Sequence, residues 1–316
     1  MKTNLLELCE LLCQQDNIVI LTHKNPDGDT LGSGFGLYYT LKHLGKHACV
    51  LNSDGFPERY QFLVPDHMEL DFEPEFVISV DIADTTLLGN QLERYANQID
   101  LCIDHHISNQ ISANYAYVIP EASSAAELVY RIAEKLVDKI EGPIATALYT
   151  GIVTDTGCFK YSNTTVECHL YAAELMKNGV EFEKINRAMF ETKSRARLGL
   201  ERLILDGMEF YCDGKCAMTA VSRKEMEELG ADNTTFDGVS AIARQIEGVE
   251  LGFTIREDGA NFYKISIRTS EKVDASQLGR LFGGGGHKRA AGCNISGTLT
   301  EVKEKLIQAA QRSLTN

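Results

Sequence analysis

Short apolar runs alternate with helical segments through the first half of the chain, and this alternation limits the possible folds more than any other feature. We expect buried strands, from their length and β-branched residues, over residues 17–22, 48–52, 76–80 and 99–103. We expect helices, from apolar residues at helical spacing, over residues 3–15, 30–44, 86–97, 124–140 and 143–153. Strands that alternate with helices build a mostly parallel sheet covered on both faces. The sequence therefore predicts an α/β fold with a doubly wound sheet.

The pattern changes after about residue 185. Residues 183–208 are charged and helix-prone, as expected of a connecting helix. Beyond them, strands are expected over residues 214–221, 250–256 and 261–269, and a helix over residues 300–313. With 316 residues, the chain is about twice the usual size of one domain. We therefore expect a first domain over residues 1–185, a helical linker over residues 186–210 and a smaller α/β domain over residues 211–316.

The charge balance limits the partners of the chain. It has 31 Lys and Arg against 45 Asp and Glu, a formal net charge of −14, which argues against a protein that coats nucleic acid or anionic lipid. No apolar run approaches the roughly 18 residues of a membrane span, and the first ten residues carry acids where a signal peptide would be apolar. The nine cysteines are scattered, and several lie in apolar runs, as in proteins of a reducing compartment. These features predict a cytoplasmic protein with no membrane partner.

Acidic and histidine side chains follow the expected strands and helices at four points. They are His23, Asp27 and Asp29 after the first strand, Asp81 after the third, Asp104, His105 and His106 after the fourth, and Asp155 after a helix. In open parallel sheets, ligands bind outside the carboxyl ends of the strands. We therefore expect these four points, although distant in sequence, to meet in one site.

Carboxylates gathered in one site repel one another. At a separation of about 5 Å and an effective dielectric constant near 20, each pair would repel by roughly 3 kcal/mol, so cations are expected among them. Carboxylate and imidazole ligands suit Mn²⁺, with Mg²⁺ or Co²⁺ as substitutes. Four carboxylates balance two divalent ions, which predicts a two-metal centre. Asp81 is the expected bridge, because it stands alone at its strand end between the other ligands.

Each piece taken alone has a simpler interpretation. A single Asp after a strand, such as Asp81 or Asp155, is usually the N-cap of the next helix. The stretch over residues 23–29 alone could be a solvated turn, and the triplet over residues 104–106 alone is only suggestive. All four pieces in this order, each at the end of an expected element, favour the metal centre.

Four consecutive glycines, Gly283–Gly286, precede three basic residues and two alanines in the second domain. The pattern predicts a bare backbone loop that enters a close-packed helix at Ala290, with N–H groups converging on an anion. The residues expected to bind a substrate phosphate are Arg268, Gly284, Gly285, Gly286, His287, Lys288 and Arg289. The alternative is a flexible glycine linker with a solvated basic turn, because the Walker lysine is missing.

Together these motifs resemble those of the DHH phosphoesterases over essentially the whole chain. The matching residues are His23, Asp27, Asp29, Asp81, Asp104, His105, His106 and Asp155, and Gly283–Gly292 resembles the DHH-associated C-terminal domain. The resemblance implies one Mn²⁺ held by His23, Asp27 and Asp81. It implies a second Mn²⁺ held by Asp29, Asp81, His105 and Asp155. It further implies that Asp104 supports these ligands and that His106 faces the phosphate, either offsetting its charge or protonating the leaving oxygen.

The two-domain size resembles the nanoRNase subgroup of this family, oligoribonucleases that also act as pAp phosphatases. The resemblance implies a manganese-dependent exonuclease that trims short RNA to mononucleotides and converts 3′-phosphoadenosine 5′-phosphate (pAp) to AMP. Its partners would be short oligoribonucleotides and small phosphorylated nucleotides, and a homodimer is left open. A phosphodiesterase for cyclic di-AMP or pApA is the nearest alternative, and a catalytically inactive nucleotide-binding regulator is another. An inorganic pyrophosphatase is disfavoured, because the glycine loop with His287 indicates an organic phosphate.

Overall fold

In the computed structural model of the chain, residues 2–236 and 238–314 are described, apart from the side chains of residues 233, 234 and 287. They divide into two compact units, Met1–Thr192 and Lys193–Asn316, which meet in sequence inside the segment expected to be the linker. No helix in the described ranges has the length and apolar character that crossing a bilayer requires. All nine cysteines are free thiols.

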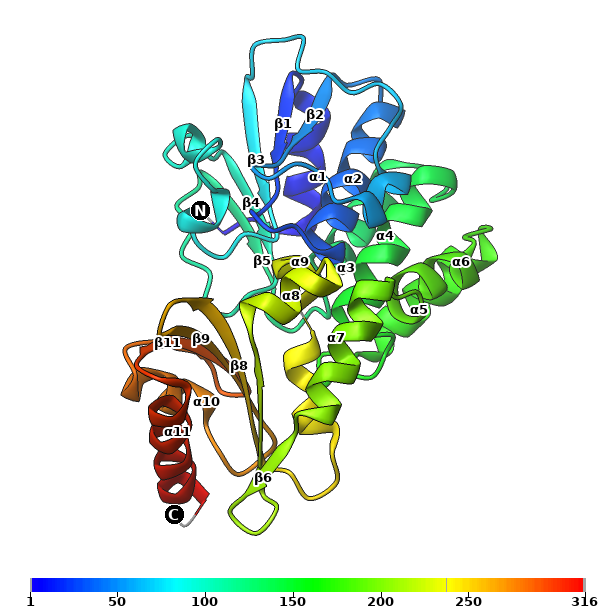
Figure 1. The fold of residues 1–316 in the computed structure, drawn as a ribbon. Coiled ribbons are helices and arrows are strands. Elements are labelled where there is room, and N and C mark those ends of the chain that lie inside the picture. Colours follow the sequence, from blue (N-terminus) through cyan, green and yellow to red (C-terminus); the bar gives the residue numbers. More distant parts are fainter. Residues whose placement is uncertain (1, 237, 315–316) are drawn as a thin grey trace. The chain divides into compact units, whose positions relative to one another are not determined.

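The first unit is built on a five-stranded sheet in which each neighbouring pair of strands is parallel. Its strands are β1 (Ile18–Leu21), β2 (Ala48–Leu51), β3 (Phe76–Val80), β4 (Leu101–Asp104) and β5 (Tyr115–Val118), in the order β2-β1-β3-β4-β5 (Figure 1). The predicted parallel α/β fold is confirmed. Because the chain order reverses between β1 and β3, a crevice forms outside their carboxyl ends.

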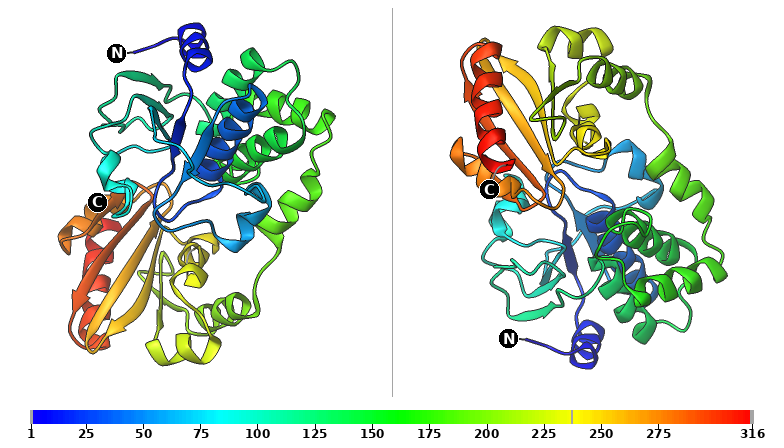
Figure 2. Two further views of the ribbon diagram at one scale, coloured as in Figure 1. Left: turned by 90° about the horizontal axis from the view of Figure 1, so that it is seen from above. Right: turned by 90° about the horizontal axis from the view of Figure 1, so that it is seen from below.

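Helices pack on one face of this sheet. They are α1 (Leu5–Gln14), α2 (Gly28–His43), α3 (Ala125–Leu136) and α4 (Gly142–Asp155), together with the 3₁₀ turn η1 (Glu58–Leu63) and the later α5 (Val166–Lys177) and α6 (Phe182–Asn186). Ile18 and Ile20 of β1 pack in the core with these helices, whereas Val19 and Leu21 face the opposite side. Figure 2 shows the helices gathered on one side of the strands.

The opposite face of the sheet is covered by short 3₁₀ turns. The prediction of one helix over residues 86–97 is therefore wrong. Two short turns, η2 (Thr85–Leu88) and η3 (Glu93–Tyr95), stand there instead. Gly89 lies between them with φ +74°, a left-handed conformation that interrupts helical backbone. The apolar side chains of the segment still pack in a small core with strand β1.

Glycine brings helices α2 and α4 into close contact. A Cβ atom added to Gly32 would lie 2.5 Å from the backbone nitrogen of Gly151, closer than side-chain carbons approach. Only glycine therefore fits at position 32 without a shift of the backbone. The contact sets the start of α2 beside the end of α4, where Asp29 and Asp155 lie.

The second unit carries a six-stranded, mostly antiparallel sheet. Its strands are β6 (Glu209–Tyr211), β7 (Cys216–Val221), β8 (Leu251–Gly259), β9 (Phe262–Thr269), β10 (Gly285–His287) and β11 (Ala290–Ser296), in the order β10-β11-β9-β8-β7-β6, with β7 and β8 parallel and the other pairs antiparallel. One face packs against α10 (Ala275–Leu281) and α11 (Leu299–Leu314). The other packs against α7 (Arg195–Asp206), α8 (Arg223–Leu229), α9 (Asn233–Phe236) and the 3₁₀ turn η5 (Val239–Gln245). The smaller α/β domain is confirmed.

Two expectations for this half of the chain are wrong. The helix expected to begin at Ala290 is strand β11, because alternate side chains (Ala291, Cys293 and Ile295) are buried, which is the period of a strand. Strand β10 pairs back onto β11, so the glycines form one side of a hairpin. The segment over residues 183–208 is not one helix, since a π-turn over Arg187–Glu191 separates α6 from α7.

Candidate metal centre

The predicted ligands lie at the carboxyl edge of the parallel sheet, where the chain order reverses. His23 follows β1, Asp81 follows β3 and His105 follows β4. Because β3 lies between β1 and β4 in the sheet, these side chains from distant parts of the sequence meet at one edge. This edge is the crevice in which open parallel sheets bind ligands.

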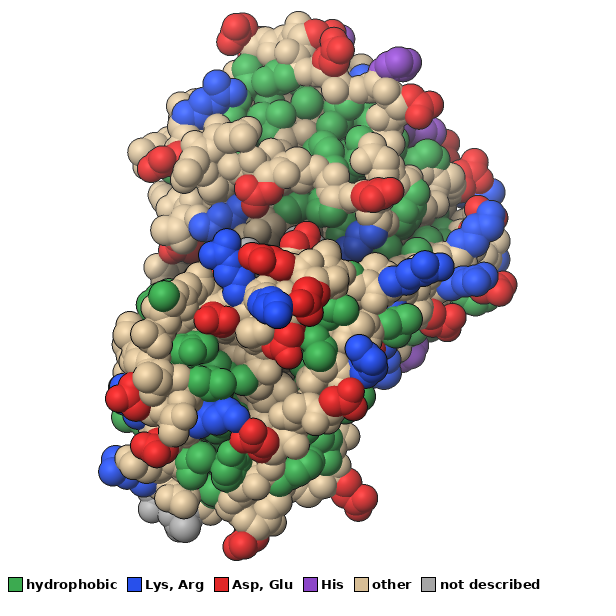
Figure 3. Space-filling model, viewed as in Figure 1, with side chains coloured by type: hydrophobic (Ala, Val, Ile, Leu, Met, Phe, Trp, Pro, Cys, Tyr) green, Lys and Arg blue, Asp and Glu red, His purple; other side chains and the backbone are tan. Residues whose placement is uncertain are grey.

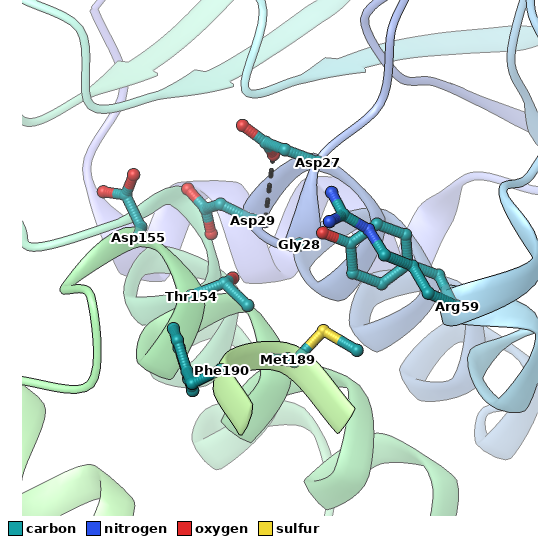
Figure 4. Close-up of a pocket in the computed structure, with 9 residues that line it drawn as sticks. Asp27, Gly28, Asp29, Arg59, Thr154, Asp155, Met189 and Phe190 are labelled. Carbon is teal, nitrogen blue, oxygen red and sulfur yellow. Dashed lines mark hydrogen bonds between the residues drawn. The ribbon is translucent and has the colours of Figure 1, made fainter. Parts of the chain in front are cut away.

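Helices α2 and α4 bring further carboxylates to this edge. Asp27 caps the start of α2, where its Oδ1 accepts a hydrogen bond from the backbone N–H of Asp29 at 3.1 Å. Asp29 accepts hydrogen bonds from the N–H groups of Ala125 and Ala126, at 2.7 and 2.9 Å. Asp155 is the last residue of α4. Figure 4 shows Asp27, Asp29 and Asp155 around one hollow.

Three groups of side chains offer ligand atoms close enough to share a metal ion. They are His23, Asp27 and Asp81; Asp29, His105 and Asp155; and Asp81, His105 and His106. Within each group the ligand atoms lie within 4.8 Å of one another. Asp81 reaches both predicted ligand sets, because its Oδ2 lies 3.7 Å from His23 Nε2 and its Oδ1 lies 3.6 Å from His105 Nε2.

Backbone carbonyls orient two of the histidines for metal binding. His23 Nδ1 lies 2.8 Å from the carbonyl oxygen of Lys24, and His105 Nδ1 lies 3.2 Å from that of Ala122. A carbonyl oxygen only accepts, so Nδ1 carries the proton and Nε2 keeps its lone pair. Both Nε2 atoms face carboxylates, the arrangement that metal-binding histidines adopt.

Asp81 is held in an energetically costly environment. Its side chain is buried, its Oδ1 has no hydrogen-bond partner among the described residues, and its backbone φ is +60°. Burial, and then the neighbouring carboxylates of Asp29 and Asp27, raise the pKa of Asp81 well above its usual value. Strained and unsatisfied groups of this kind cluster at functional sites. Two divalent ions would balance the four carboxylates, so these residues fit a two-metal centre.

Asp104 and His106 form a pair beside these ligands. Asp104 is fully buried, and its Oδ1 accepts hydrogen bonds from the His105 backbone N–H and from His106 Nδ1, each at 2.8 Å. Its Oδ2 accepts a hydrogen bond from Asn109 Nδ2. The hydrogen bond to Asp104 raises the pKa of His106 above its usual value. Both oxygens of Asp104 are used in holding neighbours, which is the placement expected of a supporting residue.

The turn Ala122–Ala126 forms hydrogen bonds with two of the predicted metal ligands, His105 and Asp29. The sequence motifs did not predict this turn as part of the site. The carbonyl oxygen of Ala122 accepts from His105, and the N–H groups at the start of α3 donate to Asp29. These contacts join residues far apart in sequence, and the turn carries no side chain that a metal motif would include.

Asn163 and Glu127 extend this support. Asn163 Nδ2 donates to the Ser123 carbonyl oxygen at 2.8 Å and to Asp155 Oδ2 at 2.9 Å. The buried Glu127 carboxylate accepts from the Ser123 N–H at 2.9 Å and from its hydroxyl at 2.7 Å. The turn therefore orients His105, Asp29 and, through Asn163, Asp155.

A cavity of about 210 Å³ adjoins the carboxylates. It is lined by Asp27, Gly28, Asp29, Arg59, Tyr60, Thr154, Asp155, Met189 and Phe190 (Figure 4). Sequence reasoning did not find Arg59, Tyr60, Met189 or Phe190 as site residues. They come from η1 and from the π-turn, which no motif marks.

The residues predicted to bind a substrate phosphate lie around one hairpin of the second unit. They are Arg268 on β9, Gly284 just before β10, Gly285, Gly286 and His287 in β10, and Lys288 and Arg289 in the turn to β11. The side chain of His287 lies outside the described residues. A Cβ atom added to Gly284 would clash with the Gly292 carbonyl oxygen, so strand packing by itself requires glycine there.

The two arginines of this hairpin region donate hydrogen bonds within the unit. Arg289 Nη1 donates to the carbonyl oxygens of Ser270 and Val273, and Arg268 Nη1 donates to that of Ile267 at 3.0 Å. A guanidinium group has five N–H donors. A part in substrate binding stays a prediction for both arginines.

The chain is similar in sequence to known domain families and proteins. The model of the DHH family, N-terminal domain, matches residues 17–152, and that of the DHHA1 domain matches residues 213–316. The bifunctional oligoribonuclease and PAP phosphatase NrnA of Thermus thermophilus is 33% identical over 309 residues, covering 94% of this chain and 90% of the relative. The cyclic-di-AMP phosphodiesterase PdeA of Listeria monocytogenes is 26% identical, covering 97% of this chain and 48% of the relative.

A solved structure has the same architecture. The exopolyphosphatase-related protein of Bacteroides fragilis matches with a TM-score of 0.89 at 26% identity, covering 98% of this chain and 95% of that one. Three findings indicate the same family: sequence identity over nearly the whole length, two matched domains and a shared architecture. The chain belongs to the DHH family, with a DHHA1 domain following the DHH domain.

Proposed function

We propose that the protein is a divalent-metal-dependent phosphoester hydrolase that shortens oligoribonucleotides to mononucleotides and removes the 3′-phosphate of pAp. One observation carries this proposal: two ligand groups converge on the buried Asp81 carboxylate at the edge of the sheet. The name of the Thermus thermophilus relative supports the substrates. Mn²⁺ is the ion we propose, because mixed carboxylate and imidazole ligands suit it, with Mg²⁺ or Co²⁺ as substitutes.

We infer the ligand assignment from the same geometry. His23, Asp27 and Asp81 would hold one ion, and Asp29, Asp81, His105 and Asp155 would hold the other. Two divalent ions in such a site stabilise charge on phosphoryl oxygens and lower the pKa of a water molecule. In the chain itself, strand β3 holds Asp81 between the two ligand sets.

His106 supplies positive charge beside this site. Its hydrogen bond to the Asp104 carboxylate orients the ring, and a carboxylate partner favours the charged imidazolium form. An imidazolium offsets negative charge on a phosphate oxygen, or donates a proton to the oxygen that leaves. The side chain is 43% exposed, so a substrate can reach it.

Short substrates fit the distribution of charge on the molecule. The chain has a formal net charge of −14, and on the face shown in Figure 3 its Lys and Arg side chains are interspersed with Asp and Glu. Long nucleic acids are held by many phosphate contacts along a basic groove, whereas a nucleotide needs few. We propose that the β10–β11 hairpin and Arg268 supply some of these contacts.

The test is turnover by the purified full chain after chelation and return of Mn²⁺. We expect phosphate from pAp and mononucleotides from RNA of about two to five nucleotides. Asp81→Ala should abolish turnover and lower the metal content, whereas Asp138→Ala, at an exposed position of the same unit, should do neither. Faster turnover of long strands would refute the substrate class. Binding of pAp without release of phosphate would refute the hydrolase and favour a nucleotide-binding regulator.

Cyclic di-AMP and pApA belong in the same comparison, because the PdeA relative matches along nearly the whole chain. Turnover of cyclic di-AMP faster than that of pAp would reassign the substrate. A cytoplasmic location is also part of the proposal, supported by nine free thiols. The homodimer stays a prediction that sedimentation equilibrium would test.

A further inference from the structure

We propose that the cavity beside the carboxylates is a nucleotide subsite of the first unit, in which Arg59 binds a phosphate and Phe190 packs against the base. This inference rests on the proposed function and adds residues that recognise the substrate. The cavity shares Asp27, Asp29 and Asp155 with the metal centre, so a molecule bound in it lies against the ligand sets (Figure 4). Its volume of about 210 Å³ is below the roughly 300–1,000 Å³ of pockets that hold a whole ligand. It therefore has room for one end of a substrate.

Arg59 places positive charge on the wall of the cavity. Its guanidinium lies over the Tyr60 ring, 4.6 Å from the centroid, and that ring is buried in the helix-covered core. The fixed ring holds the guanidinium through a cation–π contact. No salt bridge to Arg59 is present in the described part of the chain, although three carboxylates line the same cavity. With those carboxylates balanced by metal ions, Arg59 leaves the cavity wall positive, and a phosphate is the anion that its planar donors match.

Met189 and Phe190 form an apolar wall of the same cavity. They lie on the π-turn Arg187–Glu191, and both side chains are half-buried. Single π-turns in helices occur often at functional sites. Figure 4 shows both side chains on the side of the cavity away from Asp27. A partly open aromatic ring can stack with a nucleobase whatever its identity.

The two walls together indicate one class of ligand. Arg59 matches a phosphate, the apolar wall matches a flat ring, and the metal ligands match a phosphoester. A nucleoside phosphate carries all three groups on one molecule. Inorganic polyphosphate lacks a group for Phe190, so it would use only part of the cavity.

The test compares each variant with a matched control. Arg94 is the control for Arg59, because it lies over the Tyr95 ring at 4.8 Å but does not line the cavity. Phe182 is the control for Phe190, because it is an exposed phenylalanine on the neighbouring α6. All four are changed to Ala in the full chain loaded with Mn²⁺. The substrates are pAp and its base-free counterpart, 1,2-dideoxyribose 3,5-bisphosphate, and binding of AMP is measured by calorimetry.

Each variant has a distinct expected result. Arg59→Ala should raise KM about tenfold for both substrates with little change in kcat, because it removes a charge-assisted hydrogen bond to phosphate. Phe190→Ala should raise KM for pAp and Kd for AMP about tenfold and leave KM for the base-free compound unchanged, because stacking needs the base. The two control variants should match the parent chain, and the metal content of all four should be unchanged.

The outcomes separate this inference from the proposed function. If the parent chain hydrolyses pAp and Arg59→Ala and Phe190→Ala do so with the KM of their controls, the subsite is refuted and the function stands. If the parent chain releases no phosphate, the function fails, and AMP binding still decides the subsite. Equal increases in KM for both substrates in Phe190→Ala would overturn the contact with the base.

Discussion

Replacing Asp81 with Asn should stabilise the metal-free protein, although it removes a predicted metal ligand. Asn keeps the size of the side chain and tolerates the left-handed backbone at this position, where φ is +60°. Above its raised pKa, Asp81 carries a buried negative charge whose Oδ1 has no hydrogen-bond partner in the described part of the chain, and the change removes that charge. The variant therefore isolates the cost of that charge.

The repulsion from one neighbouring carboxylate, that of Asp27, gives the magnitude of the gain. Ligand oxygens of Asp27 and Asp81 lie within 4.8 Å of each other. Two unit charges at that separation repel by about 3.5 kcal/mol at an effective dielectric constant near 20, and by about 1 kcal/mol in bulk water. The Asp27 side chain is 57% exposed, so solvent screens part of this repulsion. We expect a gain of about 1–2 kcal/mol, or roughly 2–8 °C in Tm for a unit of this size.

The pH dependence of stability gives an independent check. Burial and neighbouring carboxylates raise the pKa values of Asp29 and Asp81 in the folded chain, and burial raises that of Asp155. A carboxyl group with a higher pKa in the folded state binds more protons folded than unfolded. The metal-free protein should therefore lose stability as pH rises from about 4 through these raised pKa values. The loss should be smaller in Asp81→Asn.

Thermal unfolding in EDTA and in Mn²⁺ measures both effects. The variant should melt above the parent chain in EDTA and below it in Mn²⁺, because only the parent gains the full free energy of metal binding. Asp138→Asn, at an exposed position of the same unit, should stay within about 0.5 kcal/mol of the parent in both conditions. If the variant is less stable than the parent in EDTA, the inference that the Asp81 charge destabilises the metal-free protein is refuted. Equal stabilisation of both proteins by Mn²⁺ would refute Asp81 as a ligand.

Three further substitutions test a residue that supports a metal ligand, a helix contact in the first unit and the basic hairpin of the second unit. Asn163→Ala removes the hydrogen bond to Asp155 Oδ2, so it should weaken the binding of one of the two ions about tenfold, as measured by calorimetry. The control Asn178→Ala loses only a hydrogen bond to a backbone carbonyl oxygen and should leave metal binding unchanged. Gly32→Ala should lower the free energy of unfolding in urea by about 1–3 kcal/mol, because its Cβ would enter helix α4; an unchanged value would contradict the close contact. Arg289→Ala should raise KM for nucleotides with metal content unchanged, and loss of metal would show that its role is not confined to substrate.

Local pattern predicted much of the first unit and the candidate ligands. The strands β1, β2, β3 and β4 fall where short β-branched runs predict them, because buried parallel strands need continuous apolar side chains. The acids and histidines that follow these strands could be assigned to one edge, since the carboxyl ends of parallel strands share it. Strand β5 and helix α5 were not predicted, as neither stands out by its apolar pattern.

Sequence by itself determined which side chains could bind metal, and tertiary structure decided what holds them in place. Asn163 reaches Asp155 and Ser123 only because α4 ends beside the start of α3, a contact between residues far apart in the chain. Arg59 and Phe190 line one cavity for the same reason. The basic hairpin shows the limit of local pattern, because Ala290 begins a strand through pairing with β9 that no neighbouring residue specifies. Hydrogen bonds and packing between distant segments depend on the folded arrangement, so these features are visible only in three dimensions.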